Sequence, residues 1–342
     1  ALCKTVSVEL KTTVIQAFNE FLKDIVNLDS DISKTARSSR DWLLGQISKF
    51  NEKDNTFPKL YSDINIHFGS FARKTKIREL DDIDLMIGLT GQGSTYTEYT
   101  DKIEINVADD AKDLLNLCHD YTNKLNSKKV INKFVSACSN VPQYSNADIK
   151  RNQEAATLQL SSYTWNFDIV PCFMTTTNIY GVSYYLIPDG NGHWKKTDPR
   201  IDKERISRIN QTHDGNVLQV IRVMKYWNRR PTMPTMSSYL LETMILNYYE
   251  AKTTTASQYV DIELPDVIAY IHNNIMYDVN DPKNIQGNIN KLTYDEKTKI
   301  KNKAYSDYYK AMEARQLEQD KDMKGSINKW REIFGDSFPK YE

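Results

Sequence analysis

The sequence predicts an α+β protein in which a mixed β-sheet with helices is followed by a helical bundle. Between about residues 64 and 187, short runs rich in β-branched and aromatic residues alternate with helical patterns, as in a sheet covered by helices. From Asp202 onward, strand patterns disappear and only helical periodicity remains. We therefore expect two domains, residues 1–200 and 201–342, because a chain of 342 residues is long enough to form two cores.

The first domain is expected to begin with two helices, because apolar residues recur at helical spacing over about 8–26 and 31–50. Trp42 falls on the expected apolar side of the second helix, with Leu43 and Ile47. After a polar linker, a further helix is expected at about 107–126. Strands are expected at about 64–69, 82–90, 130–137, 156–163, 164–172 and 178–187.

The second domain is expected to contain only helices. One of them carries a buried apolar stripe that includes Val220 and Met224, with Lys225 at its edge. The expected helices span about 203–213, 215–229, 236–251, 263–277, 291–318 and 322–334.

Candidate metal ligands occur in the predicted strand at 82–90. Side chains alternate faces along a strand, so Asp82 and Asp84 project to one side while Ile83 and Leu85 project into a core. Two carboxylates so close together raise each other's pKa and resist joint ionisation. A divalent cation removes this problem, and Mg²⁺ takes carboxylate oxygens, waters and substrate phosphates as ligands. Asp168, in a later predicted strand, would complete the site if its strand lies beside the first.

Other acidic residues have simpler interpretations. Most Asp-x-Asp pairs are turns or helix caps, and Asp29 and Asp31 are typical of charges at a helix N-terminus. Asp82 and Asp84 differ because they lie in an apolar run, where an unpaired carboxylate would be costly to bury. Asp81 precedes the strand and is expected to face away from Asp82, as a surface or capping residue.

A candidate phosphate-binding turn precedes these aspartates. The predicted strand ends at Gly69, whose missing Cβ allows a tight turn and a close approach of the backbone to a ligand. Ser70 would then open a short helix whose N–H groups and hydroxyl can donate to phosphate oxygens.

Composition limits the classes of partner. Lysine and arginine total 45 and aspartate and glutamate total 45, and this zero balance argues against extended nucleic-acid binding, which usually requires a basic excess. A local basic stretch, Lys74–Arg78, could still serve a triphosphate or an activating ligand. No apolar run approaches the ~20 residues that span a membrane, so we expect a soluble, cytoplasmic protein without a membrane partner. Cysteine spacing indicates neither a zinc site nor a disulfide framework, so reduced thiols are expected at Cys3, Cys118, Cys138 and Cys172.

Gly-Ser, then Asp-x-Asp, then a late lone Asp in a strand resembles the pattern of the DNA polymerase β-like nucleotidyltransferase superfamily. Within it, "GSFARKTKIRELDDIDLMI" together with "KYWNRR" and "SSYLLE" resembles the bacterial cGAS/DncV-like nucleotidyltransferases (CD-NTases) of anti-phage CBASS systems. The resemblance extends from Ile64 to about Pro339. It implies a polymerase β-like core, a C-terminal helical bundle like that of oligoadenylate synthetase, and an N-terminal helix that spans both lobes.

The resemblance also implies an activity. Such enzymes join nucleoside triphosphates, here ATP and a second triphosphate such as GTP, into a cyclic di- or trinucleotide that activates a separate effector. Asp82 and Asp84 would hold two Mg²⁺ or Mn²⁺ ions, and Asp168 would hold the catalytic one. Regulatory partner proteins encoded alongside the enzyme are a further expectation.

By the same resemblance, three residues of the second domain would bind nucleotide. Lys225 would reach the triphosphate, Ser238 would touch phosphate and Tyr239 would stack on the base. The alternative for Tyr239 is core packing with Leu240 and Leu241.

Two other functions fit the aspartates. A template-independent RNA nucleotidyltransferase or polymerase would share them but should carry a basic RNA-binding surface, which the zero net charge disfavours. A catalytically silent nucleotide-binding sensor would normally have lost one of the three carboxylates.

Overall fold

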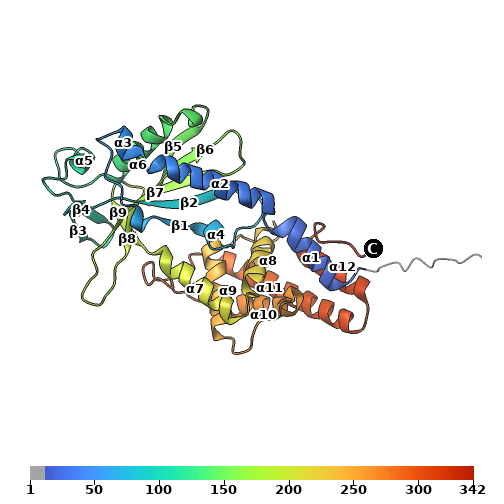
Figure 1. The fold of residues 1–342 in the computed structure, drawn as a ribbon. Helices are drawn as coiled ribbons and strands as arrows, with labels where there is room; N and C mark the ends of the chain where they lie inside the picture. The colour runs from blue at the N-terminus through green and yellow to red at the C-terminus, as the bar shows by residue number, and fades with distance from the viewer. Residues whose placement is uncertain (1–11) are drawn as a thin grey trace, which may run out of the picture. The chain divides into compact units, whose positions relative to one another are not determined.

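The computed structural model describes residues 12–342, which form two compact units (Figure 1). The sheet unit comprises Ser30–Glu204, and the helical unit comprises the described residues up to Asp29 together with Arg205–Glu342. The predicted α+β fold class is confirmed. The N-terminal helices divide between the units, because the chain passes from one to the other after Asp29. The expected domain boundary after residue 200 stays a prediction.

Within the described residues, the sheet unit is built on a nine-stranded mixed sheet of order β1-β2-β7-β8-β9-β4-β3, and β6 joins β5 to β7. The central strands β2 and β7 run parallel and lie side by side (Figure 1), whereas the other pairs are antiparallel. The strands are β1 Ile66–Phe68, β2 Asp82–Gly88, β3 Thr95–Glu98, β4 Ile103–Asn106, β5 Asp148–Asn152, β6 Ala155–Gln159, β7 Asn166–Met174, β8 Tyr185–Pro188 and β9 Trp194–Thr197.

The sheet unit has fewer helices than strands, and the longest helices are α2 and α6. The α6 helix packs on β5, β6 and β7. The helices of this unit are α2 Ser30–Ile47, α3 Phe50–Lys53, α4 Gly69–Ala72, α5 Lys112–Leu115 and α6 Ser127–Ser139, with short 3₁₀ turns at Ser62–Ile64 and Pro142–Tyr144.

The strand predicted at 130–137 is wrong, because this segment belongs to α6. Its β-branched residues suggested a strand, but Val130, Ile131 and Phe134 are buried at helical spacing. Asn126 caps the helix by accepting a hydrogen bond from the N–H of Lys128 at 3.0 Å.

The helix predicted at 107–126 is also wrong, since only α5 is helical there. The chain turns back at Tyr121, whose φ is 60°, and bridges from Cys118 to Leu125 in an antiparallel pairing. Leu114, Leu117 and Leu125 of this segment are buried although they do not form one helix face.

The predicted side of the second N-terminal helix is partly wrong. Leu43 and Ile47 are buried, but Trp42 is 40% exposed. Trp42 makes an edge contact with Tyr144, with ring centroids 5.3 Å apart. A large ring can thus lie at the border of a core without entering it.

The helical unit contains the helices expected for the second domain, with slightly different ends. The unit's aromatic core joins its first described helix to its C-terminal segment: Phe18 packs edge-on against Trp330 and Phe338, with centroids 5.0 and 4.9 Å apart. Residues 8–11 of the first expected helix lie outside the described residues. The helices are α1 Val14–Phe21, continued by a π-helix at Leu22–Val26, α7 Pro199–Thr212, which starts in the sheet unit, α8 Val217–Arg229, α9 Ser238–Ala251, α10 Val260–Asn274, α11 Tyr294–Gln319 and α12 Met323–Phe334.

In the part of the chain that the structure describes, no helix combines the length and the apolar character that crossing a bilayer requires. The cysteines Cys118, Cys138 and Cys172 are buried free thiols, and burial raises the pKa of Cys138 to about 12.

Candidate active site

Three carboxylates converge at the N-terminal ends of the parallel strands β2 and β7. Asp84 and Asp168 are direct neighbours in the register of the two strands. Asp82 lies two residues before Asp84 and therefore on the same face of β2. One oxygen of each of Asp82, Asp84 and Asp168 lies within 4.8 Å of the others. Among the described residues, no other group of three acidic, histidine or cysteine side chains meets this spacing. The structure therefore brings together the three aspartates that the sequence suggested.

The carboxylates lie beside a hydrophobic cluster. Ile83 and Leu85 are 2% and 0% exposed on one face of β2, as the alternation predicted. On the face that carries Asp84, the next residue, Met86, is buried with Val170 of β7. The cluster also contains Ile64, Ala155, Cys172, Tyr185 and Ile187. Apolar side chains thus exclude water on one side of the carboxylates.

This environment disfavours full ionisation of the site. Burial raises the pKa of Asp84 to about 7, and the charges of Asp82 and Asp168 add to the shift. Burial and the neighbouring Asp81 raise the pKa of Asp82 as well, although Lys76 opposes them. A divalent cation would reverse these shifts, because it supplies the positive charge that three clustered carboxylates lack.

Lys76 is a cation already present at the site. Its Nζ lies 2.7 Å from Oδ1 of Asp82 and also contacts Asp81. Burial by itself lowers the pKa of Lys76, but hydrogen bonds and charges of Asp81 and Asp82 outweigh burial and raise it. Asp81 is exposed, as predicted, but it does not act separately from Asp82, because the two share Lys76.

Thr157 fixes the orientation of Asp168. It lies directly opposite Asp168 in the antiparallel pairing of β6 with β7. Its Oγ1 donates a hydrogen bond to Oδ1 of Asp168 at 2.7 Å. The sequence did not indicate a role for Thr157, and it suggested only a ligand-binding role for the basic stretch that contains Lys76. Both contacts depend on which strands and loops become neighbours.

The Gly69-Ser70 turn follows β1, whose last residue, Phe68, pairs with Asp84. Gly69 has φ of 75°, and a Cβ at this position would lie 1.9 Å from Oδ2 of Asp84. Glycine is therefore required both for the backbone conformation and for the space that Asp84 occupies. The carbonyl of Ser70 accepts hydrogen bonds from the N–H groups of Thr75 and Lys76, at 2.9 and 3.1 Å. The predicted short helix at Ser70 is present as α4, which spans a single turn.

The remaining candidates belong to the helical unit. Lys225 is buried and forms an ion pair with Glu242, with 2.7 Å between Nζ and Oε1. The exposed Ser238 follows the N-cap of α9. Tyr239 is half-buried rather than packed in the core, its hydroxyl donates to Asp281 at 2.9 Å, and Nζ of Lys283 lies 4.1 Å from its ring centroid. The nucleotide-binding roles of these three residues stay predictions.

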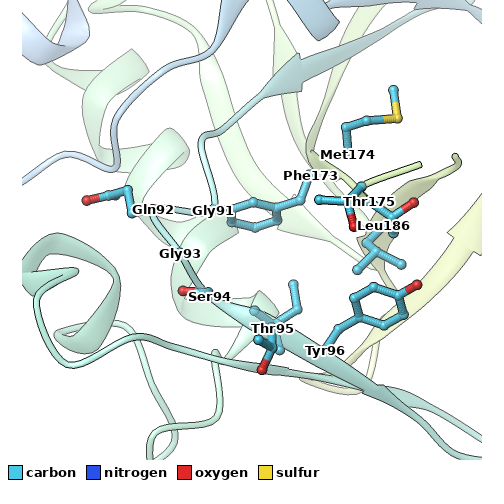
Figure 2. A pocket seen from close by; sticks show the side chains of 12 residues that line it. Gly91, Gln92, Gly93, Ser94, Thr95, Tyr96, Phe173, Met174, Thr175 and Leu186 are labelled. Carbon is cyan, nitrogen blue, oxygen red and sulfur yellow. The ribbon is translucent and has the colours of Figure 1, made fainter. Parts of the chain in front are cut away.

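A cavity of about 450 Å³ lies in the sheet unit (Figure 2). Phe173 and Met174, at the C-terminal end of β7, line it together with Tyr96 of β3. Six residues of extended chain separate Asp168 from Met174, or about 20 Å at the rise of a strand. This cavity is therefore separate from the carboxylate site.

Known proteins resemble this chain over nearly its whole length. No protein-family model matches it. A Bacillus cereus (strain VD146) protein named as a probable cyclic nucleotide synthase is 48% identical over 331 residues, which cover 96% of this chain and 99% of the relative.

Solved structures agree in fold. Escherichia coli MS115-1 CdnC, determined with ATP, has a TM-score of 0.68 at 17% identity and covers 95% of this chain and 98% of its own. Vibrio cholerae DncV cyclic AMP-GMP synthase, described as a prokaryotic cGAS homologue, has a TM-score of 0.55 at 12% identity and covers 81% of this chain and 69% of its own. The similarity to both is one of fold.

The relative at 48% identity establishes the family, and the shared fold and the three converging aspartates agree with it. The chain belongs to the bacterial cGAS/DncV-like nucleotidyltransferases, a family of cyclic nucleotide synthases.

Proposed function

We propose that this enzyme joins nucleoside triphosphates into a cyclic di- or trinucleotide by metal-assisted attack of a ribose hydroxyl on an α-phosphorus, with release of pyrophosphate. The observation that carries the metal-assisted part is the group of three carboxylates, whose ligand atoms lie within 4.8 Å of one another. Family membership supports cyclic nucleotide synthesis itself.

The donor set suits Mg²⁺ or Mn²⁺. All three candidate ligands are carboxylates, which are the oxygen donors that these hard cations prefer. Asp82 and Asp84 would hold two ions and Asp168 would hold one of them. Ions bound there would stabilise charge on the attacking and leaving oxygens of an in-line displacement.

Asp168, Gly69 and Ser70 would have further roles in the proposed reaction. Asp168 engages Thr157 through Oδ1, which leaves Oδ2 to accept the proton of the attacking ribose hydroxyl. Gly69 allows the turn that carries Ser70 to lie against Asp84, and the hydroxyl of Ser70 would donate to a phosphate oxygen. Most of the rate enhancement would then come from positioning and charge stabilisation.

Substrates and partners are proposed by analogy. Structures of CdnC with ATP and of DncV with the linear intermediate 5′ pppA(3′,5′)pG support ATP and a second triphosphate as substrates. Lys225 and Ser238 would contact the triphosphate, and Tyr239 would stack on a base. CdnC also forms a complex with HORMA-deltaN, which supports a regulatory protein partner for this enzyme. A cytoplasmic role in anti-phage defence, through an effector that binds the product, completes the proposal.

Product analysis tests the reaction. The protein is incubated with each pair of labelled nucleoside triphosphates and Mg²⁺ or Mn²⁺, then with phosphatase and a linkage-specific nuclease. A phosphatase-resistant product that the nuclease opens is the expected result, and the double variant Asp82→Ala, Asp84→Ala should not make it. A ladder of linear products would instead support the template-independent polymerase, and turnover by the double variant would contradict the proposed site.

The hydrogen bond from Thr157 gives a second prediction. Thr157→Val removes the donor while keeping the shape, and kcat should fall about 10- to 100-fold, as expected for loss of a hydrogen bond to a charged group. Thr157→Ser keeps the hydroxyl and should retain most of the activity. Initial rates at saturating nucleotide measure the effect, with thermal melting as the control for folding. Equal losses in the two variants would show that packing, rather than the hydroxyl, matters at this position.

A further inference from the structure

Lys76 and Asp81 form a unit beside the proposed metal site that the catalytic scheme does not use. The Nζ of Lys76 contacts both Asp81 and Oδ1 of Asp82. The side chain of Lys76 is only 12% exposed, whereas those of Asp81 and Asp82 are 68% and 41% exposed. The ammonium is thus held between a carboxylate of the proposed metal group and a carboxylate outside it.

The backbone at Lys76 is anchored independently of this ion pair. Its N–H donates to the carbonyl of Ser70 at 3.1 Å, next to the similar bond from Thr75. The long side chain can therefore change partners while the main chain stays attached to the Gly69-Ser70 turn. A lysine suits such exchange, because its ammonium is a compact charge on a flexible stem with three rotatable donors.

This geometry implies that Lys76 and a divalent cation would compete for the carboxylate of Asp82. An incoming divalent cation would bind the carboxylate of Asp82, whose Oδ1 the ammonium of Lys76 already contacts. The two cations would repel each other at such a short separation. Asp81 offers the displaced ammonium a nearby carboxylate that the metal does not need.

We propose that Lys76 is the resident counter-cation of Asp82 in the metal-free enzyme and moves wholly onto Asp81 when a divalent ion binds. The Lys76–Asp81 pair thereby sets the metal concentration at which the site fills. This inference rests on the proposed metal-dependent function and assigns Lys76 and Asp81 as positioning residues. Neither residue touches the reacting atoms in this scheme.

The proposal predicts opposite effects from two substitutions. Lys76→Met removes the competing cation, so the protein should bind Mn²⁺ about 5- to 20-fold more tightly, a fraction of what a charge-assisted hydrogen bond contributes. Asp81→Asn removes the alternative partner, so Lys76 stays on Asp82 and Mn²⁺ binding should weaken. The loss caused by Asp81→Asn should be smaller when Lys76 is already methionine, because Asp81 then acts only through its own charge beside Asp82.

The measurement is a titration of nucleotide-free protein with Mn²⁺, in which the electron paramagnetic resonance signal reports free Mn²⁺. Lys133→Met serves as the matched control, because it removes another lysine–aspartate pair of the sheet unit, with Asp54 at 3.1 Å, and should leave the affinity unchanged. Thermal melting of each variant without metal confirms folding.

The outcomes separate this inference from the function on which it rests. If wild-type protein binds no Mn²⁺, the proposed metal site is wrong and the inference fails with it. If wild-type protein binds Mn²⁺ and Asp84→Asn abolishes binding, the metal site stands. In that case, unchanged or weaker binding by Lys76→Met would overturn the role of Lys76 alone, because the lysine would then hold Asp82 in its ligating orientation instead of competing for it.

Discussion

Replacement of Asp84 by asparagine is expected to abolish product formation while making the metal-free protein more stable at neutral and alkaline pH. The amide keeps the size of the side chain but lacks the charge that a metal ion requires. Loss of such a group from a catalytic unit typically lowers kcat by at least about 10³-fold. Rates of product formation with saturating nucleotide and Mg²⁺ measure this effect.

The gain in stability follows from the pKa of Asp84. Burial, with the charges of Asp82 and Asp168, raises this pKa to about 7 in the folded protein, whereas the ordinary value is 3.8. Between these values the folded state retains a proton that the unfolded state releases, so the free energy of unfolding of the wild type falls as pH rises from about 4 to 7. Asparagine has no such dependence. The advantage of the variant should therefore grow over this range and persist above it.

Urea unfolding in the presence of a chelator, at about pH 5 and about pH 8, tests the sign, and the difference between variant and wild type should reach a few kcal/mol at most. Asp148→Asn is a suitable control, because Asp148 forms an exposed pair with Lys150 and should change neither activity nor stability. An Asp84→Asn protein that is less stable than wild type at the higher pH would contradict the raised pKa.

Replacement of Gly69 by alanine is expected to impair both folding and activity. The backbone at Gly69 has φ of 75°, where an L-residue is strained by about 1–2 kcal/mol. The new methyl group would also lie 1.9 Å from Oδ2 of Asp84, so either the turn or the carboxylate must move. Overpacking of this kind adds about 1–3 kcal/mol. Displacement of Asp84 should lower kcat by about 10-fold or more, because small misplacements of a reacting group reduce rates strongly.

A second glycine separates the two causes. Gly181 has the same φ of 75°, but a Cβ there meets no atom within 4 Å. Gly181→Ala should therefore show only the cost of backbone strain and should keep full activity. Chemical unfolding of both variants measures the difference. Equal destabilisation in the two variants would mean that the site accommodates the methyl group without cost, and the close packing of Gly69 against Asp84 would then have no role.

Local patterns predicted the parts of the site that lie on one strand or one turn. Alternation within β2 was enough to place Asp82 and Asp84 on one face, because side-chain direction along a strand has a period of two residues. The Gly-Ser turn was recognisable for a similar local reason, since a residue without a Cβ allows a tight turn and a close approach of the backbone. The helices of the second unit were predicted because helical spacing of apolar residues persists over long segments that contain no strand pattern.

Short segments were harder to predict, because local and tertiary preferences compete there. The residues of α6 contain enough β-branched side chains to suggest a strand, and burial of one helical face against β5, β6 and β7 decided otherwise. The polar strand β5 carried no apolar alternation and was missed, since pairing with β6 rather than burial holds it in the sheet.

The sequence by itself determined the kind of chemistry: two aspartates on one strand face, a glycine turn before them and a third aspartate within apolar surroundings. Tertiary structure alone decided that Asp84 and Asp168 are direct neighbours. It also decided that Thr157 donates a hydrogen bond to Asp168 and that Lys76 forms an ion pair with Asp82. The physical reason is that the direction of a side chain follows from its own strand, whereas its neighbours depend on the register between strands distant in the chain. That register is set by the packing of the whole sheet unit.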